Sequence, residues 1–284
     1  MAIALAIASA VLFGAMSVTL RFALARGASP DVGALLTMLP ALAVTVVVAA
    51  GEGHFHHVSA AWPFALAGLV APGGSQILFT LAVRDAGPSR TSVLVGTAPL
   101  FSVAIALTAL GEPLVPLLVV GAVLIVAGGF LLAGERSRPE TFRLVGYAFA
   151  LVATALFATR DNLLRWLAVD TDVPAALAAV TTLASGTLVV LAFVAVRRAG
   201  QRVSRADVRG FALAGLLFGL SYTALFEAYY RGRVTVVSPL VATESLFGVA
   251  FSALVIRRAE LIGRGLVTGA LLIVAGGALI GAFR

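Results

Sequence analysis

Long runs of apolar residues, separated by short polar stretches, fill the chain from end to end. A helix that crosses a bilayer needs about 20 mostly apolar residues, which is about the length of these runs. We expect ten such helices, at about 2–24, 31–50, 62–83, 89–110, 114–133, 143–168, 174–196, 209–230, 234–256 and 261–282. The pattern therefore predicts an all-α integral membrane protein with ten transmembrane helices.

The stretches between the runs are short and carry turn and charge signals, such as ARGASPD, GEGHFHH and GERSRPET. The longest connection, 197–209, has about a dozen residues, so no soluble domain fits between the helices. We therefore expect the protein to act inside the bilayer or at its two faces. The first run has no basic segment before it, which favours a spanning helix over a cleaved signal.

Composition points to lipid as the main solvent, because 61% of the residues are hydrophobic, 12% are charged and the mean hydropathy is +1.07. A soluble protein of this size could not cover so many apolar residues with polar ones. The chain has no cysteine, which excludes disulfides and thiolate metal sites. All 20 basic residues are arginines, and most of them lie in short clusters between the runs, a pattern typical of membrane orientation rather than of nucleic-acid binding.

Four stretches of the first half recur in the same order in the second half, which indicates a duplication. The matched pairs are FGAMSVTLRFAL with FATRDNLLRWLA (13–24 and 157–168), PGGSQILFTLA with FGLSYTALFEA (72–82 and 218–228), GTAPLFSVA with ATESLFGVA (96–104 and 242–250), and GAVLIVAGGFL with GALLIVAGGAL (121–131 and 269–279). We place the repeats at 1–135 and 141–284, each with five helices. An odd number of helices makes the second copy enter the membrane upside down, as in the inverted-topology repeats of secondary transporters.

These motifs resemble those of the drug/metabolite transporter superfamily, in its ten-helix EamA-like branch. The resemblance rests on FG and a following Arg in the first run, matched by FA and a following Arg in the sixth, on TAPLF in the fourth, and on the duplicated LIVAGG ending. It implies a permease, not an enzyme, that moves a small metabolite or drug-like solute, often outward, across a bacterial cytoplasmic membrane. In the second copy Glu244 and Ser245 replace Ala98 and Pro99, so the two halves differ at this position.

Glu244 is the deepest acid in the chain and lies in an apolar run. A charge at the centre of a spanning helix is costly, so we expect Glu244 to face the interior of the bundle. Two interpretations remain open. Glu244 could bind the substrate or couple transport to protons, together with its neighbour Ser245, or it could form a structural pair with Arg160 or Arg165.

The sixth run carries Arg160, Asp161 and Arg165. Asp161 and Arg165 are four residues apart, so they could neutralise each other on one helix face. The repeat offers a second interpretation, since Arg21 matches Arg165 and Ser17 matches Asp161. Two arginines converging on a central cavity would suit an anionic or zwitterionic solute.

The eighth run carries Glu227, which lies four residues before Arg231 and could simply pair with it. Tyr222 matches Gln76 in the repeat, and both follow glycines, so we expect these two side chains to line a cavity.

The sequence carries no P-loop, nucleophile–base group or haem signature, so we expect no catalytic residues and no cofactor. His54, His56 and His57 lie in one loop with Glu52 as the nearby acid and no thiol, which is a poor ligand set, so we expect no metal site there either. They are the only basis for the alternative of a membrane-embedded enzyme or lipid-handling protein. The glycine-rich runs favour close helix packing within the chain or in a homodimer.

Membrane orientation follows from the distribution of arginines, because cytoplasmic loops are enriched in positive charge. The odd-numbered loops hold Arg26, Arg84, Arg90, Arg136, Arg138, Arg143, Arg197, Arg198, Arg202, Arg205, Arg209, Arg257, Arg258 and Arg264. The even-numbered loops and the termini hold Arg231, Arg233 and Arg284. This count places both termini outside the cytoplasm, whereas members of the resembling family are often drawn the other way.

Overall fold

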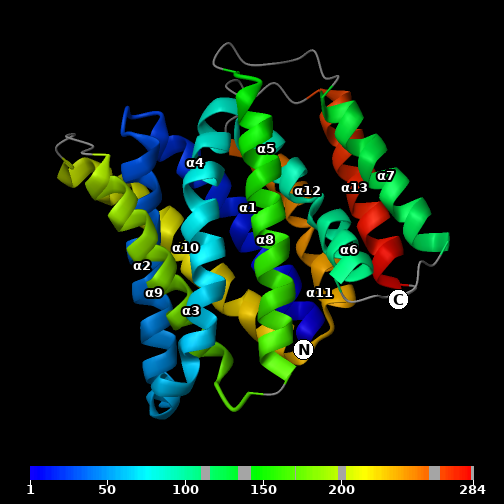
Figure 1. Ribbon diagram of the computed structural model, residues 1–284. Helices are drawn as coiled ribbons and strands as arrows, with labels where there is room; N and C mark the ends of the chain where they lie inside the picture. Colours follow the sequence, from blue (N-terminus) through cyan, green and yellow to red (C-terminus); the bar gives the residue numbers. More distant parts are fainter. Residues whose placement is uncertain (110–115, 134–141, 170, 198–202, 256–262, 283–284) are drawn as a thin grey trace.

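The computed structural model describes residues 1–109, 116–133, 142–169, 171–197, 203–255 and 263–282, and these residues form helices and no strand (Figure 1). The helices are α1 (Ala2–Leu24), α2 (Pro30–Gly51), η1 (His54–Ala61), α3 (Trp62–Gly68), η2 (Leu69–Gly74), α4 (Ser75–Ala86), α5 (Pro88–Val95), α6 (Ala98–Ala109), α7 (Pro116–Ala133), α8 (Val145–Val169), α9 (Ala175–Val196), α10 (Arg205–Arg231), α11 (Val234–Val241), α12 (Glu244–Val255) and α13 (Arg264–Ala282). The prediction of an all-helical chain is confirmed for this part of the molecule.

Among the described residues, length and hydropathy identify six helical segments that could cross a membrane, at 2–24, 30–51, 58–86, 175–196, 205–231 and 236–255. Two shorter apolar helices lie at 120–131 and 264–279. Large apolar side chains on the outer surface are strongly exposed, for example Phe130 at 74% and Val47 at 70%. Such a surface suits contact with lipid chains better than contact with water.

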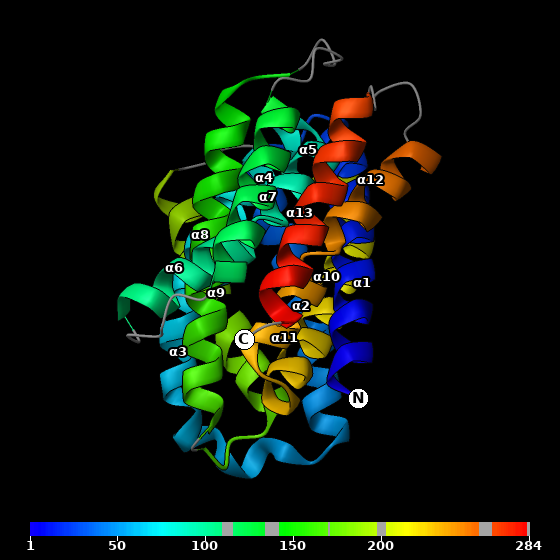
Figure 2. The same ribbon diagram turned by 90° about the vertical axis from the view of Figure 1, so that its right-hand side faces the viewer.

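The helices form a bundle in which α7 and α13 lie side by side at one edge, with α2 and α9 at the other (Figure 1). The same pairing of α7 and α13 is visible from the side (Figure 2). In the middle, α1 packs against α10, α4 packs against α8, and α5 packs against α12. Phe13 of α1 is at the centre of this contact, because its ring lies 5.1, 6.1 and 6.2 Å from those of Phe79, Phe157 and Phe218.

Three of the runs that we expected to form continuous helices are interrupted in the structure. The run 62–83 breaks at Ala71, whose backbone is extended (φ −147°, ψ 125°) just before Pro72. The runs 89–110 and 234–256 break at Gly96–Thr97 and at Ala242–Thr243. Hydropathy averaged over a run does not reveal such breaks, because the segments on both sides of each break are apolar overall.

The breaks between α5 and α6 and between α11 and α12 have the same local geometry. Thr97 Oγ1 donates to the carbonyl of Leu94 at 2.6 Å, and Thr243 Oγ1 donates to that of Leu240 at 2.5 Å. The backbone N–H groups of both threonines bond to the same carbonyls, at 3.0 and 3.1 Å. A threonine hydroxyl that bonds to nearby backbone competes with the regular helical pattern. In the first break, Pro99 also lacks the N–H that would continue it.

Glycines hold α7 and α13 in close contact. A methyl carbon built on Gly128 would lie 2.6 Å from the carbonyl oxygen of Gly269, and one built on Gly276 would lie 2.5 Å from that of Gly121. No side chain larger than hydrogen fits at either position without displacing backbone. The glycine-rich runs therefore serve helix packing within the chain.

Candidate functional site

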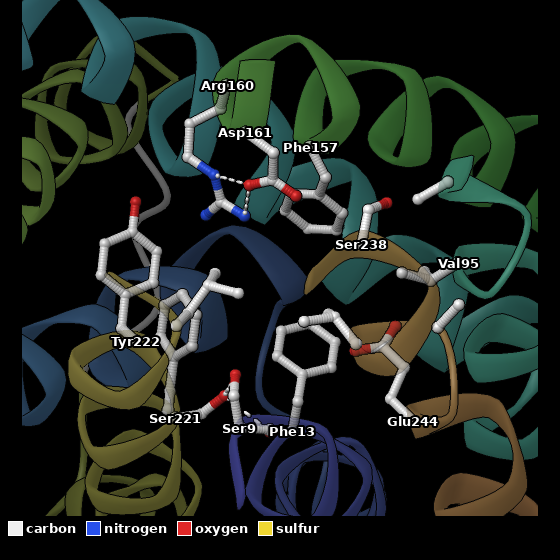
Figure 3. A pocket seen from close by; sticks show the side chains of 15 residues that line it. Ser9, Phe13, Val95, Phe157, Arg160, Asp161, Ser221, Tyr222, Ser238 and Glu244 are labelled. Carbon is white, nitrogen blue, oxygen red and sulfur yellow. Dashed lines mark hydrogen bonds and ion pairs between the residues drawn. The ribbon is translucent and has the colours of Figure 1, made fainter. Parts of the chain in front are cut away.

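A small enclosed cavity lies in the middle of the bundle, among α1, α8, α10 and α11, the end of α5 and the starts of α6 and α12 (Figure 3). Its volume is about 40 Å³, and a cavity can hold a water molecule from about 10–15 Å³ upward. It therefore has room for a few water molecules but not for a solute the size of an amino acid. A second, larger hollow of about 280 Å³ between α5, α6, α7 and α8 is lined by apolar residues with Thr97 and Tyr147, and by no charged side chain.

Arg160 and Asp161 of α8 form the charged wall of the cavity (Figure 3). Arg160 Nε donates to Asp161 Oδ1 at 2.8 Å, and Nη2 lies 2.7 Å from the same oxygen. The hydroxyl of Tyr229 donates to Asp161 Oδ2 at 3.0 Å, so both carboxylate oxygens have partners. Both charged side chains are 6% exposed, and a buried pair of this kind is stable only when its hydrogen bonds are satisfied.

Aromatic rings form the next wall of the cavity. The guanidinium carbon of Arg160 lies 5.1 Å from the ring centre of Tyr222 and 5.6 Å from that of Phe157, within the range of cation–π attraction. The Tyr222 hydroxyl donates to the carbonyl of Ala71 at 3.3 Å and so provides a hydrogen bond at the break after α3. Phe13 and Phe218 complete the apolar lining.

Glu244 lies on the opposite wall, as the first residue of α12, and its carboxyl group points into the cavity (Figure 3). The residue is 3% exposed. Its Oε1 has no hydrogen-bond partner within the described part of the chain. The start of a helix carries partial positive charge, which favours a carboxylate there. The cavity thus contains one acid that is fully paired, Asp161, and one that is not, Glu244.

Serine hydroxyls line the remaining surface. Ser9 and Ser221 lie 3.0 Å apart through their side-chain oxygens, and the Ser221 hydroxyl donates to the carbonyl of Ser9 at 2.9 Å. Ser238 of α11 also faces the cavity (Figure 3). The site therefore combines aromatic faces, a few hydroxyls and one unpartnered carboxyl group, which is typical of binding a small organic molecule.

The model of the EamA-like transporter family matches this chain twice, over residues 1–134 and 144–282. The chain belongs to the EamA-like transporter family. It is therefore a multi-pass integral membrane protein and a membrane transporter of the drug/metabolite transporter superfamily, as the resemblance implied. A solved structure titled only "Crystal structure of protein" is 23% identical, covers 95% of this chain and 96% of its own, and has a TM-score of 0.65, which supports the fold. No curated protein matches the chain.

Two arginines that we expected to converge on the cavity of this EamA-like transporter do not line it. Arg21 Nη1 donates to the carbonyl of Arg84 at 2.7 Å, and Arg165 Nη1 donates to that of Tyr229 at 3.1 Å. Both carbonyls lie near the C-terminal ends of helices, α4 and α10, where helical carbonyls lack partners. The matched arginines thus make equivalent contacts in the two halves, outside the cavity.

The Asp161–Arg165 ion pair that helical spacing suggested does not form in the structure. Asp161 pairs with the adjacent Arg160 instead. Glu227 pairs with Arg231, whose Nε donates to its carboxylate at 2.7 Å, and does not line the cavity.

Three uncharged residues from the expected set also lie outside the cavity. Gln76 is fully buried, and neither its amide nitrogen nor its oxygen has a partner within the described residues. Ser17 donates to the carbonyl of Gly14 at 2.8 Å and lies 3.2 Å from the hydroxyl of Ser92. Ser245 donates to the carbonyl of Ala242 at 2.9 Å. Both serines lie where α1, α5 and α12 meet.

Sequence reasoning missed Ser9, Phe13, Phe157 and Ser238 as cavity residues. Phe13 and Phe157 occupy equivalent positions in the two repeats, and this match was a signal that could have identified them. Ser9 and Ser238 carried only the weaker signal of a hydroxyl in an apolar run. Within the described part of the chain no group of three metal-ligating side chains occurs, and the side chains of His54, His56 and His57 lie outside it.

Proposed function

We propose that this EamA-like chain is a secondary transporter that moves a small organic solute by alternating access. Its binding site is the cavity between Glu244 and the Arg160–Asp161 pair. The chain crosses a bacterial cytoplasmic membrane ten times, as two inverted five-helix repeats at 1–135 and 141–284, and it works as an exporter.

Helix packing supports the inverted repeat. The contact of α1 with α10 has its counterpart in that of α8 with α4, and the contact of α2 with α10 has its counterpart in that of α9 with α3 and η2. In both cases, replacing each helix of one repeat by the equivalent helix of the other repeat converts the first contact into the second. Gly128 and Gly276 make equivalent contacts across the α7–α13 interface. This agrees with a two-fold axis that relates the two repeats.

The observation that carries the proposal is the position of Glu244. It is a buried acid at the break of a discontinuous helix, and it faces an enclosed cavity. Discontinuous helices that meet near the bilayer centre form the binding sites of many secondary transporters. A cavity of about 40 Å³ describes a closed state, so α5–α6 and α11–α12 have to move for a solute to enter or leave.

Glu244 can exchange a proton during this cycle, because a carboxyl group facing a cavity meets water in the open states and the helices around it in the closed one. The charged and titratable groups that share the cavity are Arg160, Asp161 and Tyr222. Protonation would remove an unpaired charge before closure, and charges without partners are costly in the membrane interior. This order of events would couple solute movement to a proton.

Transport in proteoliposomes tests the proposal. Purified wild-type protein is assayed for proton-coupled movement of a defined library of amino acids, primary amines and short carboxylic acids, against protein-free liposomes. We expect at least one solute to move, with a rate that depends on the pH gradient. In Glu244→Gln the pH dependence should disappear, while Glu227→Gln, which changes an acid paired outside the cavity, should behave like wild type.

The outcome separates the alternatives. Movement of a solute that is equally pH-dependent in Glu244→Gln removes this residue from coupling. Movement without any pH dependence identifies a facilitator. If no solute of the library moves, the transporter proposal fails. A phenotype of the intact cell that is lost after alanine replacement of His54, His56 and His57 would then favour the membrane enzyme instead.

A further inference from the structure

When Glu244 is ionised, the charges around the cavity do not cancel, and the excess is negative. Arg160 is bonded to Asp161 through Nε and Nη2, at 2.8 and 2.7 Å. Glu244 is the remaining charged residue of the lining, and within the described part of the chain it has no ion pair. A solute in this cavity therefore meets a neutralised arginine on one side and an unpaired carboxyl group on the other.

The guanidinium of Arg160 is poorly placed to receive an anion. One edge is occupied by Asp161, and the rings of Tyr222 and Phe157 lie 5.1 and 5.6 Å from its central carbon. An anion bound at Arg160 would lie close to two carboxylates, those of Asp161 and Glu244, in a site with little water. Arg21 and Arg165, which could have added positive charge, are bonded to carbonyls elsewhere.

A cation meets the opposite conditions. The carboxyl group of Glu244 provides a counter-charge, and Phe13, Phe157, Phe218 and Tyr222 provide aromatic rings around the same space. The face of an aromatic ring attracts an ammonium group and also packs against an apolar carbon skeleton. The hydroxyls of Ser9 and Ser238 add acceptors for N–H groups.

We propose that the substrate of this site is a small organic cation, an ammonium group on an apolar body, with the ammonium against Glu244 and the body among the aromatic rings. The proposal rests on the transporter function proposed above and names the substrate class for it. It reverses the charge that the sequence suggested, because the arginines on which that expectation depended do not reach the cavity.

Four probes of similar shape and different charge test the proposal at a single fixed pH: 2-phenylethylammonium, 3-phenylpropionate, phenylalanine and 2-phenylethanol. Binding to the purified protein is measured by calorimetry and by the shift in melting temperature, and uptake is measured in proteoliposomes. We expect 2-phenylethylammonium to bind and to be transported, and the anion and the alcohol to do neither.

The variants assign the binding to the carboxyl group. Glu244→Gln keeps the size and hydrogen-bonding capacity of the side chain but removes the charge, so the Kd for 2-phenylethylammonium should rise about tenfold or more. Glu227→Gln should leave the Kd unchanged, since Glu227 does not line the cavity. A melting temperature of each variant without probe confirms that both are folded.

Other outcomes overturn the proposal in distinguishable ways. If 3-phenylpropionate binds and phenylethylammonium does not, the site takes anions and the transporter function stands. If phenylalanine binds more tightly than the amine, the class is zwitterionic and Arg160 contributes. If the amine neither binds nor moves while another solute of the transport library moves, the cationic substrate class is rejected and the transporter function stands. If nothing moves, the transporter function falls as well.

Discussion

At the scale of single residues, the buried Arg160–Asp161 pair makes the folded state sensitive to the loss of either partner. Removing one partner of a buried ion pair leaves the other charge without compensation, at a cost of about 3–5 kcal/mol. We therefore predict that Asp161→Asn lowers the free energy of unfolding by about that amount. Tyr229→Phe, which removes the neutral donor to Asp161 Oδ2, should lower it by about 1–3 kcal/mol. Reversible unfolding in mixed micelles measures both changes.

The matched control is the double variant Arg160→Leu with Asp161→Leu. It removes both charges together, so we expect it to be clearly more stable than Asp161→Asn alone, because two apolar side chains leave no unpaired charge. If Asp161→Asn unfolds at the same denaturant concentration as wild type, the pair does not hold α8 in place.

Single residues were also where sequence reasoning was least complete. Burial of Glu244 follows from the cost of a charge in lipid, and the structure agrees with it. The partner of Asp161 did not follow, because helical spacing indicates which residues share a face and not which carbonyl lies within reach. Arg165 bonds to the carbonyl of Tyr229 on another helix, and no pattern within the sixth run contains that information.

At the scale of elements, Gly128 and Gly129 offer a matched pair of neighbours in α7. Gly128 contacts the backbone of α13, whereas nothing lies within 4 Å of a methyl carbon built on Gly129. We predict that Gly128→Val separates the two helices and costs about 1–3 kcal/mol, as overpacking does. Gly129→Val should change stability by about 0.5 kcal/mol or less. Melting temperatures of the two variants in detergent check this, and equal values would contradict the packing of α7 on α13.

The positions of the helices could be predicted from the sequence, whereas the breaks within them could not. The apolar runs mark where helices lie because lipid requires a continuous apolar surface over about 20 residues. Their hydropathy does not mark a break, since the hydroxyl of Thr97 or Thr243 bonds to backbone without making the run less apolar. The breaks are nevertheless the elements that bring Glu244 to the cavity.

At the scale of the whole molecule, the duplication was the strongest signal, because four collinear matches predict related halves without any knowledge of side-chain contacts. The cavity could not be predicted in the same way. Its charged groups, Arg160, Asp161 and Glu244, all come from the second half and correspond to Met16, Ser17 and Ala98 in the first. A chain of two related halves thus carries an asymmetric site, and only the packed structure reveals which side chains face it.

Orientation is a property of the whole molecule that an experiment can decide directly. The arginine distribution predicts that the C-terminus after Arg284 and the N-terminus lie outside the cytoplasm, because Arg26, Arg84 and Arg143 belong to loops on the opposite side. Alkaline phosphatase fused to Arg284 should therefore be active, and a green fluorescent protein fused there should be dark.

Fusions after Arg197, at the end of α9, provide the internal control, because this residue begins a loop on the arginine-rich side. They should give the opposite result, a fluorescent protein that glows and a phosphatase that is inactive. A fluorescent fusion at Arg284 combined with an active phosphatase at Arg197 would reverse the orientation. The side of the membrane on which the cavity opens to load its solute would then have to be reassigned, although the fold and the binding site would stay as they are.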